Sequence, residues 1–422
     1  MKRKYRIPII FLTAIFMLPN TAVNAESKKE SITAEEAAEK IYVDLTEYKE
    51  IELNDKKTKL DDYTVKRYLD EAEQQLESND KNIEQGKSKL NSSDISSEEK
   101  NQYRYQIEYL NIYGFELQRN KYYYEMQNKL SELYEEYSDK IVLEQKNKIK
   151  YETYKTLCEI KLYESQTEYL KVLSKQRKTE LNITQESFKI GYATENEVLL
   201  AESGYKAAKS ELAAYENNYA ALINRIEKES GNTLTDFSLI FSASPKYESK
   251  KYLEQFKKQS FYSEYYLKQS EIYEEYSKSL NKLVKQMDKE YTKNQYTFLF
   301  SNNKGFFERT YKYISDEKTY YENESEIYKL DSEKYSFESE LYIMESCGNL
   351  NTLLSRRTAK LAEIRAAESS YAIAQKLLNK GRINELNLIE SRSNLQKVRY
   401  ELLQIKTEIL VIKFALENEI IV

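Results

Sequence analysis

Few residue types in this chain of 422 residues could carry out chemistry, and the most versatile of them is absent. The sequence contains no histidine, which excludes histidine-based triads, the commonest general base and most zinc sites. Its 70 aspartate and glutamate residues are so abundant that paired carboxylates would arise by chance, and its eight glycines are scattered singly, without a phosphate-binding loop. We therefore expect a protein that is not an enzyme and that holds no cofactor and no metal.

The two cysteines are the remaining residues with reactive side chains. Cys158 lies 33 positions before Gly191, and Cys347 lies 34 positions before Gly381, so the two thiols occupy near-equivalent places along the chain. A disulfide between them requires their Cα atoms to approach within about 7 Å. The alternative interpretation, and the simpler one, is two buried free thiols.

The first 25 residues have the pattern of a secretory signal peptide. Met1–Arg6 carry four basic side chains, Ile7–Leu18 are almost all apolar, and Val23-Asn24-Ala25 form a small-x-small cleavage site. Residues 1–25 are thus a predicted signal peptide, and the mature chain is expected in the cell envelope. Its place there would be the outer membrane if the organism has one, and otherwise the cell surface or the extracellular space.

The composition points to long helices. The net charge of −5 becomes −9 when the four basic residues of the signal peptide are removed, which excludes the basic footprint of a nucleic-acid-binding protein. Charged residues make up 32% of the chain and the mean hydropathy is −0.78, yet aromatic residues reach 13%. Disordered chains are poor in aromatic residues, so narrow buried stripes on long helices fit this composition better.

The elements that position these residues occur twice. GYATENEVLLAESGYKAAKSEL begins at Gly191 and GRINELNLIESRSNLQKVRYEL begins at Gly381, while Gly114-Phe115 upstream recurs as Gly305-Phe306. This spacing predicts two helical hairpins of one design, joined head to tail. Pro245 is the single proline after the signal peptide and marks the joint. The predicted repeats are residues 26–231 and 247–422, with a linker over 232–246.

A sustained 3.5-residue period predicts coiled-coil packing after each glycine. In the second repeat the periodic residues are Leu388, Ser391, Leu395, Val398, Leu402, Ile405, Ile409, Ile412 and Leu416, and most of their counterparts 190 positions earlier are apolar too. A serine-rich break near residue 92 is followed by a helix start, with Ser96 or Ser97 as its cap. The predicted fold is all-α or nearly so, with helices at 33–92, 116–189, 194–230, 247–294, 307–379 and 384–420.

This doubled pattern resembles the TolC-like outer-membrane efflux channel family. The similar parts are Gly191 with Glu197–Ala201, Gly381 with Asn387–Glu390, and the two Gly-Phe pairs, where family members return from strand to helix. The resemblance implies a homotrimer whose hairpins form a hollow α-barrel. Such a trimer would be the passive exit duct of a tripartite efflux or secretion system, for small molecules or polypeptides, docked on a membrane-fusion-type adaptor and an inner-membrane pump of ABC or similar type.

The resemblance also assigns roles to residues around the glycines. The tips of the hairpins would dock on the adaptor, through Gly191, Tyr192, Ala193, Thr194, Gly381, Arg382, Ile383 and Asn384. Some family members constrict the pore with acidic rings six and nine residues after the second glycine, which are Asn387 and Glu390 in this chain. A tight helix–helix turn and a solvated surface glutamate are the simpler interpretations of the same residues.

The chain departs from the family where that family forms membrane strands. Tyr296–Ser301 could make one short strand, whereas Arg104–Tyr113 reads equally well as helix, and neither provides the 9–11 alternating residues that a membrane strand needs. We therefore expect at most short vestigial strands at this end. A secreted coiled-coil structural, adhesion or scaffold protein of the envelope, without channel activity, is the alternative function.

Overall fold

The computed structural model describes residues 32–234, 237–241, 246–294 and 298–420; the predicted signal peptide, residues 1–25, lies outside them. Eight α-helices, one short 3-10 helix and one pair of two-residue strands make up the described secondary structure. The helices are α1 (Ala34–Ile41), α2 (Thr46–Leu90), α3 (Ser97–Lys189), α4 (Glu195–Ser230), α5 (Ser249–Gln259), α6 (Tyr262–Asn294), α7 (Phe298–Asn379) and α8 (Glu385–Glu417), with η1 (Tyr42–Asp44) between α1 and α2. The expectation of a nearly all-α fold built on long helical hairpins is confirmed.

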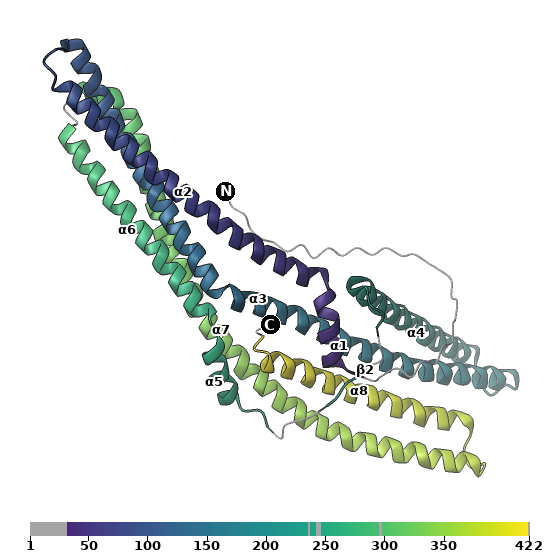
Figure 1. Ribbon diagram of the computed structural model, residues 1–422. Coiled ribbons are helices and arrows are strands. Elements are labelled where there is room, and N and C mark those ends of the chain that lie inside the picture. The colour runs from purple at the N-terminus through teal and green to yellow at the C-terminus, as the bar shows by residue number, and fades with distance from the viewer. Residues whose placement is uncertain (1–31, 235–236, 242–245, 295–297, 421–422) are drawn as a thin grey trace.

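The molecule is elongated, and its helices run along its length (Figure 1). The α3–α4 and α7–α8 turns lie at one end, whereas the α2–α3 turn, the last residues of α6 and the first residues of α7 lie at the other. The short elements α1 and α5 lie between the two ends. Because α3 contacts α6, α7 and α8 as well as α2 and α4, it joins the two hairpins side by side.

A small core at mid-length ties the start of the described chain to the segment after α4. β1 (Ile32–Thr33) pairs in parallel with β2 (Phe237–Ser238). Thr33 then caps α1 through a capping box with Glu36. Ala34, Ala37 and Ala38 of α1 are buried in one cluster with Phe237 and with Leu157 of α3. These strands are as short as expected, but they lie far from the place where a strand was predicted.

The prediction of a strand over Tyr296–Ser301 is wrong for residues 298–301, which the structure describes. Residues 298–301 are the first residues of helix α7, and Tyr296 and Thr297 lie outside the described residues. The chain in the matching place, Arg104–Tyr113, is helical as well. Helices therefore occupy both described segments in which strands were considered.

Two helix starts were predicted too late, at the Gly-Phe pairs where the resemblance implies a return from strand to helix. α3 begins at Ser97 rather than 116 and runs through Gly114, and α7 begins at Phe298 rather than 307 and runs through Gly305. At Gly114 the missing side chain has a packing role, since a Cβ would lie 3.3 Å from Nδ2 of Asn79. Asn79 is buried in α2, and its Nδ2 donates a hydrogen bond of 3.1 Å to the Leu110 carbonyl.

The other boundaries agree more closely with the sequence. Ser96 caps α3 through a capping box with Glu99, as predicted. The segment predicted as one helix over 247–294 is instead divided into α5 and α6, because Ser260 takes an extended backbone between them. The predicted helix over 33–92 is divided into α1, η1 and α2, and the last helix ends at Glu417 rather than 420.

Helices α6 and α7 pack through alternating layers of serine and tyrosine. The Ser270 and Ser325 hydroxyl oxygens lie 3.1 Å apart, and one heptad further along each helix those of Ser263 and Ser332 lie 2.9 Å apart. Between such layers the ring of Tyr273 lies 5.4 Å from the ring of Tyr321 and also 5.4 Å from that of Tyr328. Small serines let the two backbones approach closely, and tyrosine rings fill the wider gaps.

The two hairpins are joined by polar side chains between α3 and α7. Arg119 makes a bidentate contact with Glu317, in which Nε lies 2.5 Å from Oε2, and both side chains are largely buried. The guanidinium lies 5.0 Å from the ring centres of both Tyr123 and Tyr313. Such a buried pair is strongly destabilising when one partner is removed, so this contact fixes the register of α3 against α7.

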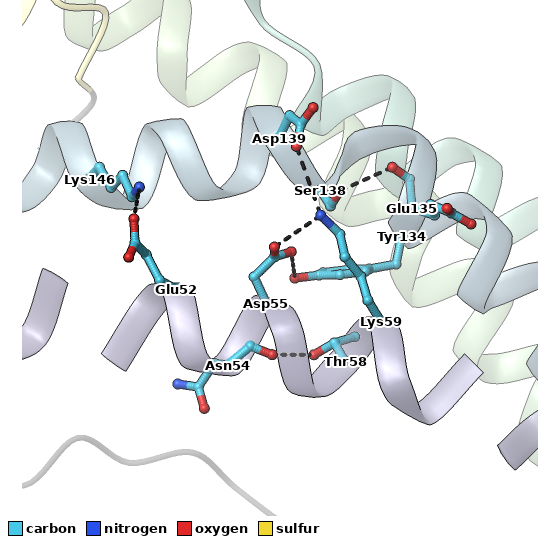
Figure 2. A network of polar contacts seen from close by, with 10 residues as sticks. All are labelled: Glu52, Asn54, Asp55, Thr58, Lys59, Tyr134, Glu135, Ser138, Asp139 and Lys146. Carbon is cyan, nitrogen blue, oxygen red and sulfur yellow. Dashed lines mark hydrogen bonds and ion pairs between the residues drawn. The ribbon is translucent and has the colours of Figure 1, made fainter. Parts of the chain in front are cut away.

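Polar contacts also fix α2 against α3 (Figure 2). Lys146 donates to Glu52 at 2.8 Å, and the Tyr134 hydroxyl donates to Asp55 at 3.3 Å. Lys59 lies 3.0 Å from the same Asp55 carboxylate.

Within the described part of the chain, no helix combines the length and apolar character needed to cross a membrane.

The buried tyrosines predict unfolding in alkali. Burial raises the pKa of Tyr151, Tyr252 and Tyr265 to about 12 each, against about 10 for an exposed phenol. A raised pKa means that the folded state holds the proton more tightly, so this stability is complete below about pH 10 and is lost as the pH rises towards 12. Phenolate absorbance and helical circular dichroism should therefore change together above pH 10. Ionisation of most tyrosines with the helical signal intact would contradict this.

Candidate functional site

The α3–α4 turn carries the first group of predicted docking residues, and its backbone forms a Schellman motif. The Tyr192 amide donates to the Ser187 carbonyl at 2.8 Å, and the Gly191 amide donates to the Phe188 carbonyl at 3.0 Å. Gly191 has φ +80°, and no atom lies within 4 Å of the place where its Cβ would be. The glycine is therefore needed for its backbone conformation rather than for space.

The α7–α8 turn has the same construction. The Arg382 amide donates to the Leu377 carbonyl at 2.9 Å, the Gly381 amide donates to the Leu378 carbonyl at 2.8 Å, and Gly381 has φ +64°. Both turns thus end their incoming helix with the same pair of hydrogen bonds. The chain builds one turn twice and presents both copies at the same end of the molecule (Figure 1).

The outgoing helices begin with different caps. Thr194 and Glu197 form a capping box at the start of α4, and the hydrogen bond from the Thr194 backbone lowers the pKa of Glu197. Asn384 accepts a hydrogen bond of 3.0 Å from the Asn387 amide at the start of α8. The position six residues after each glycine is therefore the third residue of the outgoing helix. An acid there has a structural role, which Glu197 performs and Asn387 does not.

The two turns differ in the surface that they expose. Around the first turn the exposed side chains are large and apolar: Tyr192 is 85% exposed, Ile190 69% and Leu200 65%, and Leu199 beside it is also exposed. Arg382 and Asn384 are exposed at the second turn, together with Lys380. Ala193 and Ile383, the third residue of each turn, are half-buried. One tip therefore offers an apolar surface and the other a polar, basic one.

Sequence reasoning missed part of the apolar tip. Ile190 and Leu199 were not among the predicted docking residues, although both are more exposed than an apolar side chain in a coiled-coil seam would be. Leu199 directly follows Val198, which belongs to the 3.5-residue period. An apolar residue outside that period is the signal in the sequence that could have indicated an exposed apolar side chain at this tip.

The predicted pore residues Asn387 and Glu390 are both exposed on α8, on either side of the buried Ile389. Their counterparts on α4 are Glu197, which is used in capping, and the exposed Leu200. The structure thus brings Asn387 and Glu390 to one exposed stretch near the second tip.

Neither cysteine takes part in this site. Cys158 and Cys347 are free and buried, the first in the cluster that contains α1 and the second in a separate cluster with Leu350 and Ile409. Burial raises the pKa of Cys158 to about 12, so its thiol is unreactive at neutral pH. Among the described residues, no group of three or more cysteine, aspartate or glutamate side chains is arranged to hold a metal ion.

Comparisons with known proteins find matches by structure alone. No protein-family model matches the chain, and no curated protein matches its sequence. Among solved structures it is similar to the CmeC outer membrane channel of Campylobacter jejuni (11% identity, TM-score 0.45, covering 96% of this chain and 94% of that one). It is also similar to the outer membrane protein VceC of Vibrio cholerae (10% identity, TM-score 0.44, covering 71% of this chain and 74% of that one). A third similar structure is the MtrE outer membrane channel of Neisseria gonorrhoeae (8% identity, TM-score 0.39, covering 97% of each chain).

Proposed function

We propose that this chain is one protomer of a TolC-like exit duct, a passive conduit of an efflux or secretion system. The observation that carries the proposal is the pair of long hairpins, joined side by side through α3, with two turns of identical backbone construction at one end. Long hairpins with a narrow buried stripe and a wide polar face are suited to the wall of a water-filled barrel. The linker over 232–246 would separate two repeats that supply equivalent parts of that wall.

One copy does not enclose a channel, so the duct needs several copies around an axis. A homotrimer would place six hairpins around the lumen. The chain has no phosphate-binding glycine loop, so the energy for transport would come from a partner pump reached through an adaptor. The exposed tips, apolar at Tyr192 and basic at Arg382, are the surfaces proposed for that contact.

The assembly itself is the first test. The mature chain, in solution and in detergent, should have three times the mass of one copy, and negative-stain images should show three-fold rings with a hollow centre. The long axis should exceed about 100 Å, because helices of this length rise about 1.5 Å per residue. A monomer or a solid rod under every condition would refute the duct and favour the coiled-coil scaffold.

Docking at the tips predicts a second result. Arg382→Glu should reduce co-purification of an adaptor from envelope extracts at least about tenfold, because a reversed charge at an interface repels its former partner. Arg392→Glu, a reversal at an exposed arginine on α8 beyond the turn, is the matched control and should leave capture unchanged. Equal capture by both variants, with unchanged circular dichroism, would show that the second tip is not the docking surface.

A ring of Glu390 carboxylates would make the duct prefer cations. In channels reconstituted in planar bilayers, Glu390→Gln should lower the cation preference, whereas Glu408→Gln, at an exposed position further along α8, should not. The same ion selectivity in both variants and in the parent chain would exclude the ring.

A further inference from the structure

A cavity of about 300 Å³ lies on α3, where the outgoing helices of the two hairpins flank it. Helices α4 and α8 each pack along α3 but make few contacts with each other (Figure 1), so the cavity lies in the groove between them. Its lining comes from all three helices. The lining residues are Glu159, Leu162, Tyr163 and Gln166 of α3, Tyr215 of α4 and Tyr400 of α8.

The walls of the cavity are largely aromatic. Tyr163 packs against Tyr215 across the α3–α4 boundary, with ring centres 5.7 Å apart. On the α8 side, the Tyr400 hydroxyl accepts a hydrogen bond of 2.8 Å from the side-chain amide of Gln404. Three tyrosines from three helices therefore surround one space.

Gln166 is a buried polar side chain whose acceptor atom lacks a partner. It is 8% exposed, and its Oε1 is buried and accepts no hydrogen bond from any described residue. A buried acceptor without a donor destabilises the fold. Because this side chain lines the cavity, a ligand that donates a hydrogen bond there would remove the penalty.

Glu159 adds a negative charge on the same face of α3, since residues seven apart on a helix lie on one side. It is half-buried and, within the described part of the chain, forms no ion pair. The glutamates on either side of it along α3 differ, because Glu152 contacts Lys155 and Glu164 contacts Lys161. The Glu159 carboxylate is therefore free to face a ligand.

The lining as a whole selects for a cation. No lysine or arginine is among the lining residues, so an anion would be repelled by Glu159 without any compensating contact. A neutral apolar molecule would remove water from the carboxylate and replace it with nothing. Aromatic faces attract cations, and cages of such rings are a known means of recognising organic ammonium ions. Burial raises the pKa of Tyr400, so that phenol stays neutral at physiological pH.

The second hairpin lacks this set of residues, although it repeats the turn and the helices. Counted forward by the 190 positions that separate the turn glycines, Leu353 takes the place of Tyr163. Arg356 takes the place of Gln166, and Asn349 takes the place of the free carboxylate. The acid, the ring and the unpaired acceptor are thus particular to one hairpin, and the hairpin fold does not require them.

We propose that this cavity binds a small organic ammonium ion that carries at least one N–H group. The N–H donates to Oε1 of Gln166, the positive charge faces Glu159, and the carbon atoms lie against the three tyrosine rings. The site goes beyond the exit duct and does not rest on it, because every lining residue belongs to one copy of the chain. A cavity of this size is at the lower limit for small-molecule sites, so the ligand is small.

Ligand-observed NMR titration of the full mature chain tests the site with three probes of similar size: butylammonium, butanol and butyrate. Butylammonium should bind at least about tenfold more tightly than butanol, because hydrogen bonds to charged groups are the stronger ones. Butyrate should not bind. Equal affinity for butylammonium and butanol would overturn the choice of an ammonium ion, and no binding of butylammonium would overturn the site.

A glutamate variant distinguishes the cavity from the acidic surface in general. Glu159→Gln should weaken butylammonium binding at least about tenfold, because it removes the charge that faces the ligand. Glu168→Gln is the matched control and should leave binding unchanged, since Glu168 is an exposed glutamate of α3 that contacts Lys171 outside the cavity. The same affinity in both variants would assign the binding to the surface and overturn the site.

A third variant separates binding from a structural role of the amide. Gln166→Leu removes an unpaired buried acceptor, so its thermal midpoint without ligand should equal or exceed that of the parent chain, while its affinity for butylammonium falls. Butylammonium should raise the midpoint of the parent chain more than that of Gln166→Leu at the same concentration. A lower midpoint of the variant without ligand, or binding with the affinity of the parent chain, would refute the role of Gln166 in holding the ion.

Discussion

The arrangement of the whole molecule depends on the lateral packing of α3 against α7 and α8. Without it the chain would be two separate hairpins on a linker, because the described contacts between the repeats run mainly through α3. The Arg119–Glu317 pair fixes this packing on one half of the molecule, and near the tips Lys175 of α3 lies 3.5 Å from Glu385 of α8. A buried ion pair contributes little net stability but tolerates no shift of register. Its main effect is to hold both glycine turns at one end.

Register between α2 and α3 depends on a buried polar residue as well as on apolar ones. Asn79 donates to the Leu110 carbonyl beside Gly114, whereas the serine contacts between α6 and α7 recur after one heptad and do not distinguish one alignment from the next. A slip by one heptad would preserve most apolar contacts in a repetitive coiled coil, but it would leave Asn79 unpaired in the interior. Long helices of similar sequence can therefore adopt a single alignment.

Sequence patterns predicted features that depend on neighbouring residues. The glycine turns, the Ser96 cap and the helices that follow Gly191 and Gly381 are all local, and all are found. Features that depend on distant residues could not be predicted. The packing of Gly114 beside Asn79 depends on a residue 35 positions earlier, and the Ile32–Phe237 strand pair joins residues some 200 positions apart. At the candidate site the turn residues were predicted, but the exposed Ile190 was not, because burial depends on helices elsewhere in the chain.

The α7 helix shows why a heptad alone does not determine which face is buried. It carries two seams on opposite faces, one of serine and tyrosine against α6 and one of larger apolar residues that stays exposed. Their hydrophobic periods are the same, so periodicity cannot rank them. Side-chain size separates them, since small serines alternate with tyrosines in the seam against α6, whereas the exposed seam carries larger apolar side chains and the charged Lys334.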